Sequence, residues 1–387
     1  MNDSAQKSLL PIGLRDGLPP YADQEAYLVE TLLATFRSYG YQRVDPPMVE
    51  FEENLLDGSG SATSQATFRL MDPVSQRMMG IRADMTPQVE RIAATRLKRS
   101  PRPLRLAYNG TVLRVKGSQL RPERQFRQVG CELIGSDSAL ADAEMVILAV
   151  EALSRAGVKD LSVDLNLPTV VKSVCQEHSI DPATARAALD QKDLKAVSEL
   201  GGKGGEILSG LVQATGRVDH ALEVLPSLIL PANAAAERDR LVEVVGLVRE
   251  ALPDLSLTVD PVEHRGFEYQ TGLSFAIFGA GVRGELGRGG RYRSVFSEDP
   301  ATGFSLYLDT VLRGLPKPKE LESIMVPSGV SPATRKELRD SGWMVVMSLE
   351  ADSNVEPEAR RLGCTHVWID GKAVLLEQPR VSEGEAS

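Results

Sequence analysis

The chain has 387 residues, enough for two or three domains, and 42% of them are apolar, as in ordinary soluble proteins. No apolar run approaches the roughly 18 residues of a membrane span, and the first residues, MNDSAQKSLLPIGLRDG, lack the apolar core of a signal peptide. We therefore expect a cytoplasmic protein with no membrane segment. The three cysteines form no CxxC pair, so we expect no zinc site, no disulfide framework and no other metal.

The formal net charge of −9 disfavours a protein that grips nucleic acid through its phosphates. The segment 91–105 holds six basic residues and no acidic one. A local patch of this kind is more typical of a solvated or interface surface than of a nucleic-acid site, so we expect no binding of tRNA.

Apolar spacing and breaker residues predict the elements of the first half of the chain. Helical spacing ends at Gly40, and Pro46-Pro47 interrupts the strand that follows. In chain order we expect a helix at 20–39, a broken strand at 41–51, hairpin strands at 66–71 and 77–82, a helix at 86–98, strands at 105–115 and 124–134 joined by a loop at 116–123, a helix at 139–156, and a strand at 161–166.

Residues 168–250 are rich in Ala, Leu, Glu and Lys and poor in aromatic residues, which predicts a helical insertion. Within it, GGKGG lacks the Ser or Thr and the spacing of a phosphate loop, so we interpret it as a flexible turn. After the insertion we expect strands at 255–260 and 267–278, a glycine-dense turn and strand in GELGRGGRY, and a core helix near 303–314.

The stretch LPKPKE has the composition of a linker. After it we expect a strand at 323–326, a helix at 332–341, a strand at 343–347, a helix at 355–362 and a strand at 366–369. Because strands and helices of the core do not alternate as βαβ units, the fold class is α+β, an antiparallel sheet flanked by helices. The expected domains are a core of residues 1–167 and 251–316, a helical insertion at 168–250, a small α/β unit at 321–378 and a disordered tail at 379–387.

Polar residues lie on several predicted strands of one sheet. In IRADMT, Arg82 and Asp84 share a face of a predicted strand, and in RQFRQVGCELIG, Gln128 and Glu132 share a face. Arg265, in HRGFEY, precedes a further strand. Carboxylates, an amide and guanidinium groups in this arrangement fit either a zwitterionic small ligand or internal salt bridges.

These segments resemble the catalytic core of the class II aminoacyl-tRNA synthetases, and histidyl-tRNA synthetase in particular. YQRVDPPMVE resembles the first motif of that family, and IRADMT resembles its R-P-E-G-T segment. RQFRQVGCE is similar to the specific tail of the second motif, HRGFEY to the histidine signature R-G-L-D-Y-Y, and RGGRY to A-G-G-R-Y. The resemblance covers roughly residues 10–314 in the right order and implies an antiparallel sheet flanked by helices.

The resemblance implies a histidine pocket. Asp84 matches the residue that holds the substrate ammonium, Gln128 lies near the same group, Glu132 matches the residue that recognises the imidazole, and Arg265 matches the one that contacts the carboxylate. The second tyrosine of the histidine signature is replaced by Gln270. The candidate histidine-binding residues are Asp84, Thr86, Arg114, Gln128, Glu132, Arg265 and Tyr269.

The ATP side of the family pattern is incomplete. Arg114 matches the arginine that grips the α-phosphate, but Lys116 replaces a glutamate of the second motif, and the loop arginine falls on Pro122, with Arg121 displaced by one position. Thr310 stands where the third motif has its ATP-clamping arginine. Fixed cations supply several kcal/mol of transition-state stabilisation in such chemistry, so we expect no adenylation, no aminoacylation, no catalytic residue and no cofactor.

A retained amino-acid pocket together with an incomplete ATP site resembles one branch of the family, the regulatory subunits of ATP phosphoribosyltransferase. ATP phosphoribosyltransferase is the first enzyme of histidine biosynthesis. The resemblance implies a short catalytic ATP phosphoribosyltransferase chain as partner, a homodimer of this chain inside a larger hetero-oligomer, and histidine as effector, in this pocket or at the subunit interface. The alternatives are a synthetase paralogue that acts as a stand-alone amino-acid sensor or modifier, and an active histidyl-tRNA synthetase.

Overall fold

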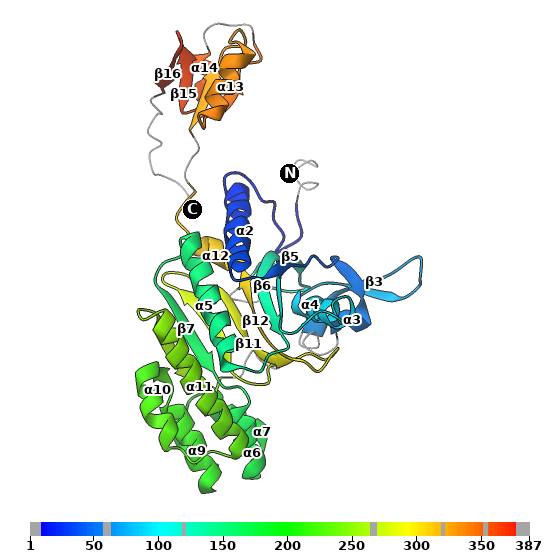
Figure 1. The fold of residues 1–387 in the computed structure, drawn as a ribbon, viewed down its shortest axis with the longest axis vertical. Coiled ribbons are helices and arrows are strands. Elements are labelled where there is room, and N and C mark those ends of the chain that lie inside the picture. Colours follow the sequence, from blue (N-terminus) through cyan, green and yellow to red (C-terminus); the bar gives the residue numbers. More distant parts are fainter. Residues whose placement is uncertain are drawn as a thin grey trace. The chain divides into compact units, whose positions relative to one another are not determined.

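The computed structural model describes residues 9–56, 63–117, 121–263, 269–318, 322–350 and 355–376 (Figure 1). The chain divides into two compact units, Met1–Pro316 and Lys317–Ser387. The predicted tail at 379–387 lies outside the described residues.

A nine-stranded sheet forms the centre of the first unit. Six neighbouring strand pairs are antiparallel, and the pairs β1 with β5 and β7 with β9 are parallel. The middle of the sheet is thus antiparallel as predicted, while the sheet as a whole is mixed. In spatial order the strands are β1 (Gln42–Arg43), β5 (Leu104–Leu113), β6 (Gln125–Ile134), β12 (Pro300–Tyr307), β11 (Gly287–Arg293), β10 (Ser274–Gly279), β7 (Leu161–Asn166), β9 (Ser256–Asp260) and β8 (Gly216–Arg217).

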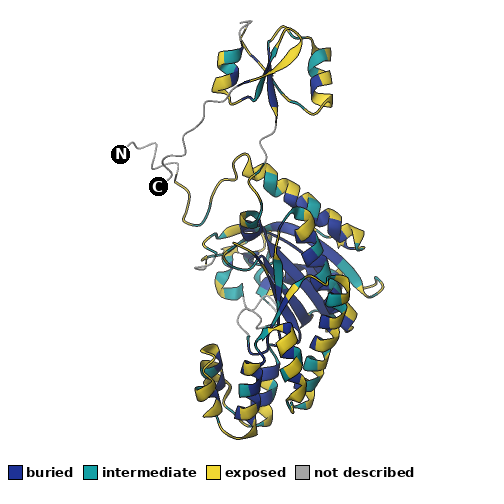
Figure 2. Ribbon diagram, turned by 90° about the vertical axis from the view of Figure 1, so that its left-hand side faces the viewer, coloured by how far each residue is buried: buried dark blue, intermediate teal, exposed yellow. Residues whose placement is uncertain are grey.

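Helices cover both faces of this sheet, and the buried strands between them are visible in Figure 2. Helices α2 (Tyr21–Ser38) and α5 (Ala139–Ala156) pack on one face, with α11 (Ala232–Ala251) beside α5. Helix α4 (Thr86–Thr95) packs on the opposite face. Alternate residues of β6 therefore enter different cores, as the period of two along a strand requires.

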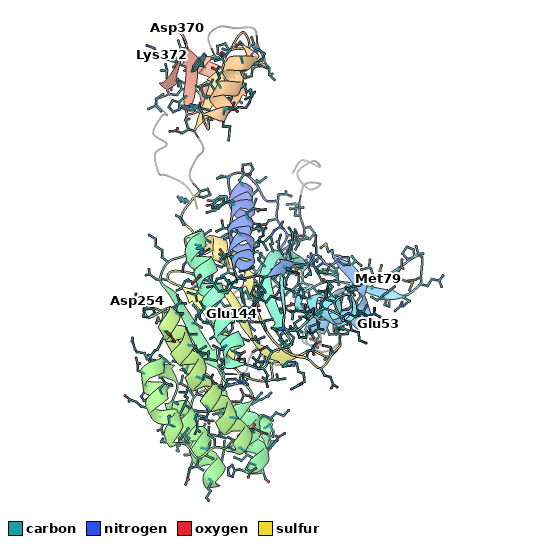
Figure 3. The ribbon with its side chains drawn as sticks, viewed as in Figure 1. Glu53, Met79, Glu144, Asp254, Asp370 and Lys372 are labelled. Carbon is teal, nitrogen blue, oxygen red and sulfur yellow. The ribbon has the colours of Figure 1, made fainter. Side chains whose placement is uncertain are left out.

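The boundaries of α5 follow from its end residues. The hydroxyl of Ser138 accepts a hydrogen bond from the Leu140 N–H at 3.2 Å, and Gly157 ends the helix with φ of +99°. Glu144, labelled in Figure 3, lies on this helix. It accepts hydrogen bonds from the Tyr41 hydroxyl at 2.7 Å and from Arg105 at 2.9 Å. These contacts tie α5 to the residues that flank β1 and to β5.

A three-stranded sheet of order β2-β4-β3 lies beside the main sheet. Its predicted hairpin is confirmed, and the carboxylate of Asp72 closes the turn by accepting from the N–H groups of Val74 and Ser75, both at 3.1 Å. Its elements are β2 (Val49–Phe51), α3 (Glu52–Leu56), β3 (Phe68–Met71) and β4 (Met78–Ile81).

Apart from β8, the elements between β7 and β9 are helical, and their buried side chains continue the core under α5. The flexible turn predicted for GGKGG is wrong, because Gly202–Gly205 form the first turn of α9. A Cβ on Gly204 would lie 2.5 Å from Ile180 Cδ1, so the missing side chain lets this turn pack closely. The helical elements before α11 are α6 (Val170–Glu177), α7 (Pro182–Asp190), α8 (Leu194–Ser198), α9 (Gly202–Gln213), α10 (Val218–Val224) and a 3₁₀ turn η2 (Leu225–Ser227).

The predicted core helix at 303–314 is wrong in its first half. Strand β12 continues to Tyr307, and only α12 (Leu308–Val311) and a 3₁₀ turn, η3 (Leu312–Gly314), follow it. Because β12 lies between β6 and β11 and is buried on both faces, its apolar run shows no alternation that would identify a strand. The strand predicted at 267–278 begins only at Ser274 within the described residues.

The second unit contains a four-stranded sheet of order β14-β13-β15-β16 with two helices. The five predicted elements are present. Strand β16 was not predicted, although Asp370-Gly371, both with positive φ, is a strong hairpin signal. The elements are β13 (Ser323–Val326), α13 (Pro332–Asp340), β14 (Met344–Met347), α14 (Glu356–Arg361), β15 (His366–Ile369) and β16 (Lys372–Leu375).

Candidate functional site

The side chain of Glu132 is at the centre of the candidate site. Strand β6 directs Val129 and Cys131 into the core under α2 and α5, which leaves Gln128 and Glu132 on the face that α4 covers. Glu132 is 1% exposed. The prediction that Gln128 and Glu132 share one face of β6 is confirmed.

Three hydroxyl groups donate hydrogen bonds to the Glu132 carboxyl. Thr86 Oγ1 and Tyr108 OH lie 3.0 and 3.2 Å from Oε1, and Tyr292 OH lies 2.9 Å from Oε2. A Cβ on Gly303 would lie 1.8 Å from Oε2, so only glycine leaves room for the carboxyl there. Strands β5, β6, β11 and β12 and helix α4 together hold the Glu132 carboxyl in place.

Burial raises the pKa of the Glu132 carboxyl to about 8. Hydrogen bonds from Tyr292 and Thr86 lower the pKa, while Glu90 and Asp84 raise it further. The carboxyl of the empty site therefore holds its proton at neutral pH. Such a group can transfer the proton to a basic ligand and retain hydroxyl donors for the carboxylate that results.

A second polar cluster lies at the N-terminus of α4. Asp84 Oδ1 accepts from the Thr86 N–H at 2.9 Å and from Gln128 Nε2 at 3.2 Å. Gln128 in turn accepts from the Met85 N–H at 3.0 Å and donates to Ser305 Oγ at 2.6 Å. Gln128 therefore holds the Asp84 carboxylate in place, and that carboxylate borders the same cavity as Glu132.

The cavity has a volume of about 640 Å³, within the range of ligand-binding clefts. One half is lined by the acids and hydroxyls around Glu132, and the other half by cationic side chains and their carboxylate partners. The charged and hydroxyl-bearing lining residues are Thr63, Asp84, Thr86, Arg114, Lys116, Arg121, Glu123, Glu132, Tyr269, Glu285, Arg288, Tyr292, Ser305, Tyr307 and Thr310.

Ion pairs within the protein engage two cations of the second half, Arg121 and Arg288. Arg121 lies 3.5 Å from Glu285 and 3.6 Å from Asp309, with its guanidinium 3.7 Å from the centre of the Tyr307 ring. Arg288 forms a 2.6 Å ion pair with the same Glu285. The side chains of Arg121 and Asp309 are 11% and 2% exposed, so this network is screened from water.

Of the remaining candidate residues, two line the cavity. Tyr269 lines the cavity with its ring centre 6.1 Å from that of Tyr292, and Arg114 lines it while donating to the Ala83 carbonyl at 3.3 Å. Arg265 lies outside the described residues. The strand predicted through IRADMT ends at Ile81.

For Arg82 the sequence left a ligand-facing role and an internal role open, and the structure supports the internal role. The structure buries Arg82, and its guanidinium donates to the carbonyls of Thr111 at 2.8 Å and Pro46 at 2.9 Å. Sequence analysis also missed Tyr108, Ser305 and the role of Tyr292. A tyrosine in a buried strand has no sequence signal that separates a core residue from a site residue, whereas the alternation after Gly289-Gly290 places Tyr292 on one face with Gly290.

Known proteins resemble the chain over almost its whole length. The family model described as histidyl-tRNA synthetase matches residues 13–311. A Rhodospirillum centenum protein named ATP phosphoribosyltransferase regulatory subunit is 54% identical over 95% of this chain and 96% of its own. The chain belongs to the family of ATP phosphoribosyltransferase regulatory subunits. Relatives of the same name from Paramagnetospirillum magneticum and Rhodospirillum rubrum are 54% and 49% identical, over 95% and 96% of this chain and 97% and 98% of theirs.

Solved structures share the fold. An ATP phosphoribosyltransferase regulatory subunit/histidyl-tRNA synthetase from Bacillus halodurans superposes with a TM-score of 0.78 at 24% identity, over 91% of this chain and 96% of that one. A histidyl-tRNA synthetase from Nostoc gives a TM-score of 0.75 at 21% identity, over 94% and 91%. The fold is therefore that of the class II synthetases, as predicted.

In the described part of the chain, none of the helices is long and apolar enough to cross a membrane. Within the same residues, no group of three or more His, Cys, Asp or Glu side chains is arranged to hold a metal ion. All three cysteines are buried and free.

Proposed function

We propose that the chain is a cytoplasmic, non-catalytic subunit that binds a short catalytic ATP phosphoribosyltransferase chain and makes its activity sensitive to histidine. Relatives that are 49–54% identical to this chain over 95–96% of its length are named ATP phosphoribosyltransferase regulatory subunit. Following the family resemblance, we also propose that the chain forms a homodimer in the complex, and that it does not bind tRNA.

Histidine is the ligand that we propose for the half of the cavity around Glu132. The observation that carries this proposal is a buried acid with a pKa of about 8 that faces three hydroxyl donors. An imidazole that takes the proton of Glu132 forms an ion pair there, and hydrogen bonds to a charged group contribute about 1.5–3 kcal/mol. Asp84 lies at the same cavity and can accept from an ammonium.

The charges of the amino acid determine which other contacts the ligand needs. A bound amino acid keeps an ammonium and a carboxylate, and each must be paired when it loses water. We propose that Asp84 and Gln128 serve the ammonium, that Arg265 pairs with the carboxylate, and that Thr86, Arg114 and Tyr269 complete the lining. Imidazole specificity then rests on Glu132.

The second half of the cavity supports the proposal that the chain does not activate amino acids. Two of its guanidinium groups are already paired, Arg121 with Glu285 and Asp309, and Arg288 with Glu285. A triphosphate would have to displace these carboxylates from buried ion pairs, which is costly. Thr310 offers no charge in their place.

The test is reconstitution with the short catalytic chain from the same genome. At micromolar concentration the two chains should elute together on size-exclusion chromatography, at a mass larger than either alone, and histidine should inhibit the mixture. Separate elution with unchanged catalytic activity would contradict the proposed function.

A further inference from the structure

Strand β11 separates the cavity from the helices on the other side of the sheet. Gly290 and Tyr292 line the cavity, and the residue between them, Arg291, points to the opposite face, as alternation along a strand requires. Tyr292 also donates to Glu132 at 2.9 Å. The position of β11 therefore determines where one of the three hydroxyl donors of Glu132 lies.

Arg291 fastens β11 to the start of α5. Its guanidinium forms an ion pair with Asp142 at 2.8 Å and donates to the carbonyls of Ser136 at 2.9 Å and Ser138 at 3.1 Å. The side chains of Arg291 and Asp142 are 6% and 3% exposed. Because the pair is screened from water, it holds β11 more firmly than a surface ion pair would.

The helical insertion joins the same ion pair. Arg240 of α11 donates to Asp142 Oδ2 at 3.1 Å, the oxygen that also accepts from Arg291 Nε at 3.1 Å. Arg240 further reaches the carbonyl of Asp137 at 3.1 Å. The Asp142 carboxylate thus connects strand β11 of the cavity wall with helix α11 of the insertion.

A second contact of α11 lies close by. A Cβ on Gly272 would come within 3.0 Å of Glu237 Oε2, so α11 also touches the segment between Tyr269 and β10. The N–H and carbonyl of Arg291 bond in turn to the carbonyl of Leu273 and the N–H of Thr271, both at 2.9 Å. Helix α11 therefore supports two neighbouring parts of the cavity wall.

We propose that Arg240 is a positioning residue for the ligand site: through Asp142 and Arg291 it fixes β11, and so couples the docking of the helical insertion to occupation of the cavity. This inference rests on the proposed function, because it takes histidine as the ligand. Coupling of this kind is reciprocal, so a ligand that fixes β11 also fixes α11.

The variants Arg240→Met and Arg240→Lys test the proposal in the full-length chain. Arg240→Met keeps the aliphatic part of the side chain and should weaken histidine binding by about three- to tenfold, a coupling typical of residues in one ion-pair network. Arg240→Lys keeps the charge near Asp142 and should restore most of the affinity. The matched control is Arg249→Met, also on α11, which removes an ion pair with Asp219 of α10 and should bind histidine as the wild-type chain does.

Two readouts separate positioning from a general loss of stability. Hydrogen exchange of the amides of β11 should be faster in ligand-free Arg240→Met, and histidine should slow exchange in α11 of the wild-type chain only. In a Tyr292→Phe background, Arg240→Met should have a smaller effect on affinity, because the hydroxyl that it positions is absent.

Each outcome has one interpretation. If the wild-type chain binds histidine and Arg240→Met binds it equally well with unchanged exchange in β11, the positioning role is wrong. If the wild-type chain binds no histidine while β11 still exchanges faster in Arg240→Met, the proposed function is wrong and the structural coupling stands. Equal effects of Arg240→Met and Arg249→Met on affinity and exchange would also overturn the inference.

Discussion

Replacement of Glu132 by glutamine is the sharpest perturbation of the site. The amide has the shape of the carboxyl group but has no proton to transfer to an imidazole. In the native chain Thr86, Tyr108 and Tyr292 all donate to this group at 2.9 to 3.2 Å. The amide nitrogen of glutamine cannot accept from any of them, so one hydroxyl must turn or lose its partner.

The expected loss of histidine affinity follows from the charge that the substitution removes. A hydrogen bond to a charged group contributes about 1.5–3 kcal/mol, which corresponds to a 10- to 100-fold weaker affinity for histidine. The pH dependence follows from the proton that Glu132 holds. Its pKa is about 8, and that of a free imidazole is about 6.5.

Between those two values the empty site and the free ligand together hold one proton, as the complex does, so the affinity of the wild-type chain should be flat. Below pH 6.5 binding must release a proton and above pH 8 it must take one up, so affinity should fall by up to tenfold per pH unit on either side. In Glu132→Gln, the decrease in histidine affinity that begins at about pH 8 should be absent.

Isothermal titration of histidine from pH 5.5 to 8.5 measures both effects. The matched control is Glu123→Gln, the same chemical change at the other half of the cavity, which should leave histidine affinity within about twofold. If Glu132→Gln binds histidine as tightly as the wild-type chain, the imidazole does not meet Glu132 and the effector lies elsewhere, for example at the subunit interface.

Three further predictions concern the same site. Gly303→Ala should abolish histidine binding in calorimetry, because its Cβ would lie 1.8 Å from Glu132 Oε2; full binding by a folded variant would refute the geometry of the cavity. The unfolding free energy from urea titration should decline as pH rises from 4.5 to about 8, because the native Glu132 keeps a proton that the unfolded chain releases, and an equal decline in Glu132→Gln would exclude this group as the cause. Histidine-dependent exchange of pyrophosphate into ATP should be absent, given Lys116, Pro122 and Thr310 at the positions of the ATP motifs, and robust exchange would disprove the non-catalytic proposal.

Local patterns predicted much of the fold. Alternation along β6 separated Val129 and Cys131 from Gln128 and Glu132, since successive side chains of a strand point to opposite faces. Helix α5 was placed to the residue because its end signal, Gly157, coincides with the end of its apolar spacing. Elements of this kind can be predicted from their own residues, without knowledge of the strands or helices that they pack against.

The errors and the points that the sequence left open concern residues whose roles depend on distant partners. Strand β12 is buried on both faces, so its apolar run gives no alternation and the predicted helix began too early. Arg82 has the chemistry of a ligand-binding residue, but the carbonyls of Pro46 and Thr111 occupy its guanidinium. The network of Arg121 with Glu285 and Asp309 joins three separate segments, and no single segment predicts it.

Histidine inhibition of the reconstituted complex tests the central claim most directly. The catalytic chain is assayed with the wild-type subunit and with Glu132→Gln over a range of histidine concentrations. The half-inhibitory concentration should rise about 10- to 100-fold with the variant, in line with the lost charged hydrogen bond, while activity without histidine stays the same. Equal inhibition of the two complexes would contradict the claim that this cavity senses histidine for the catalytic partner.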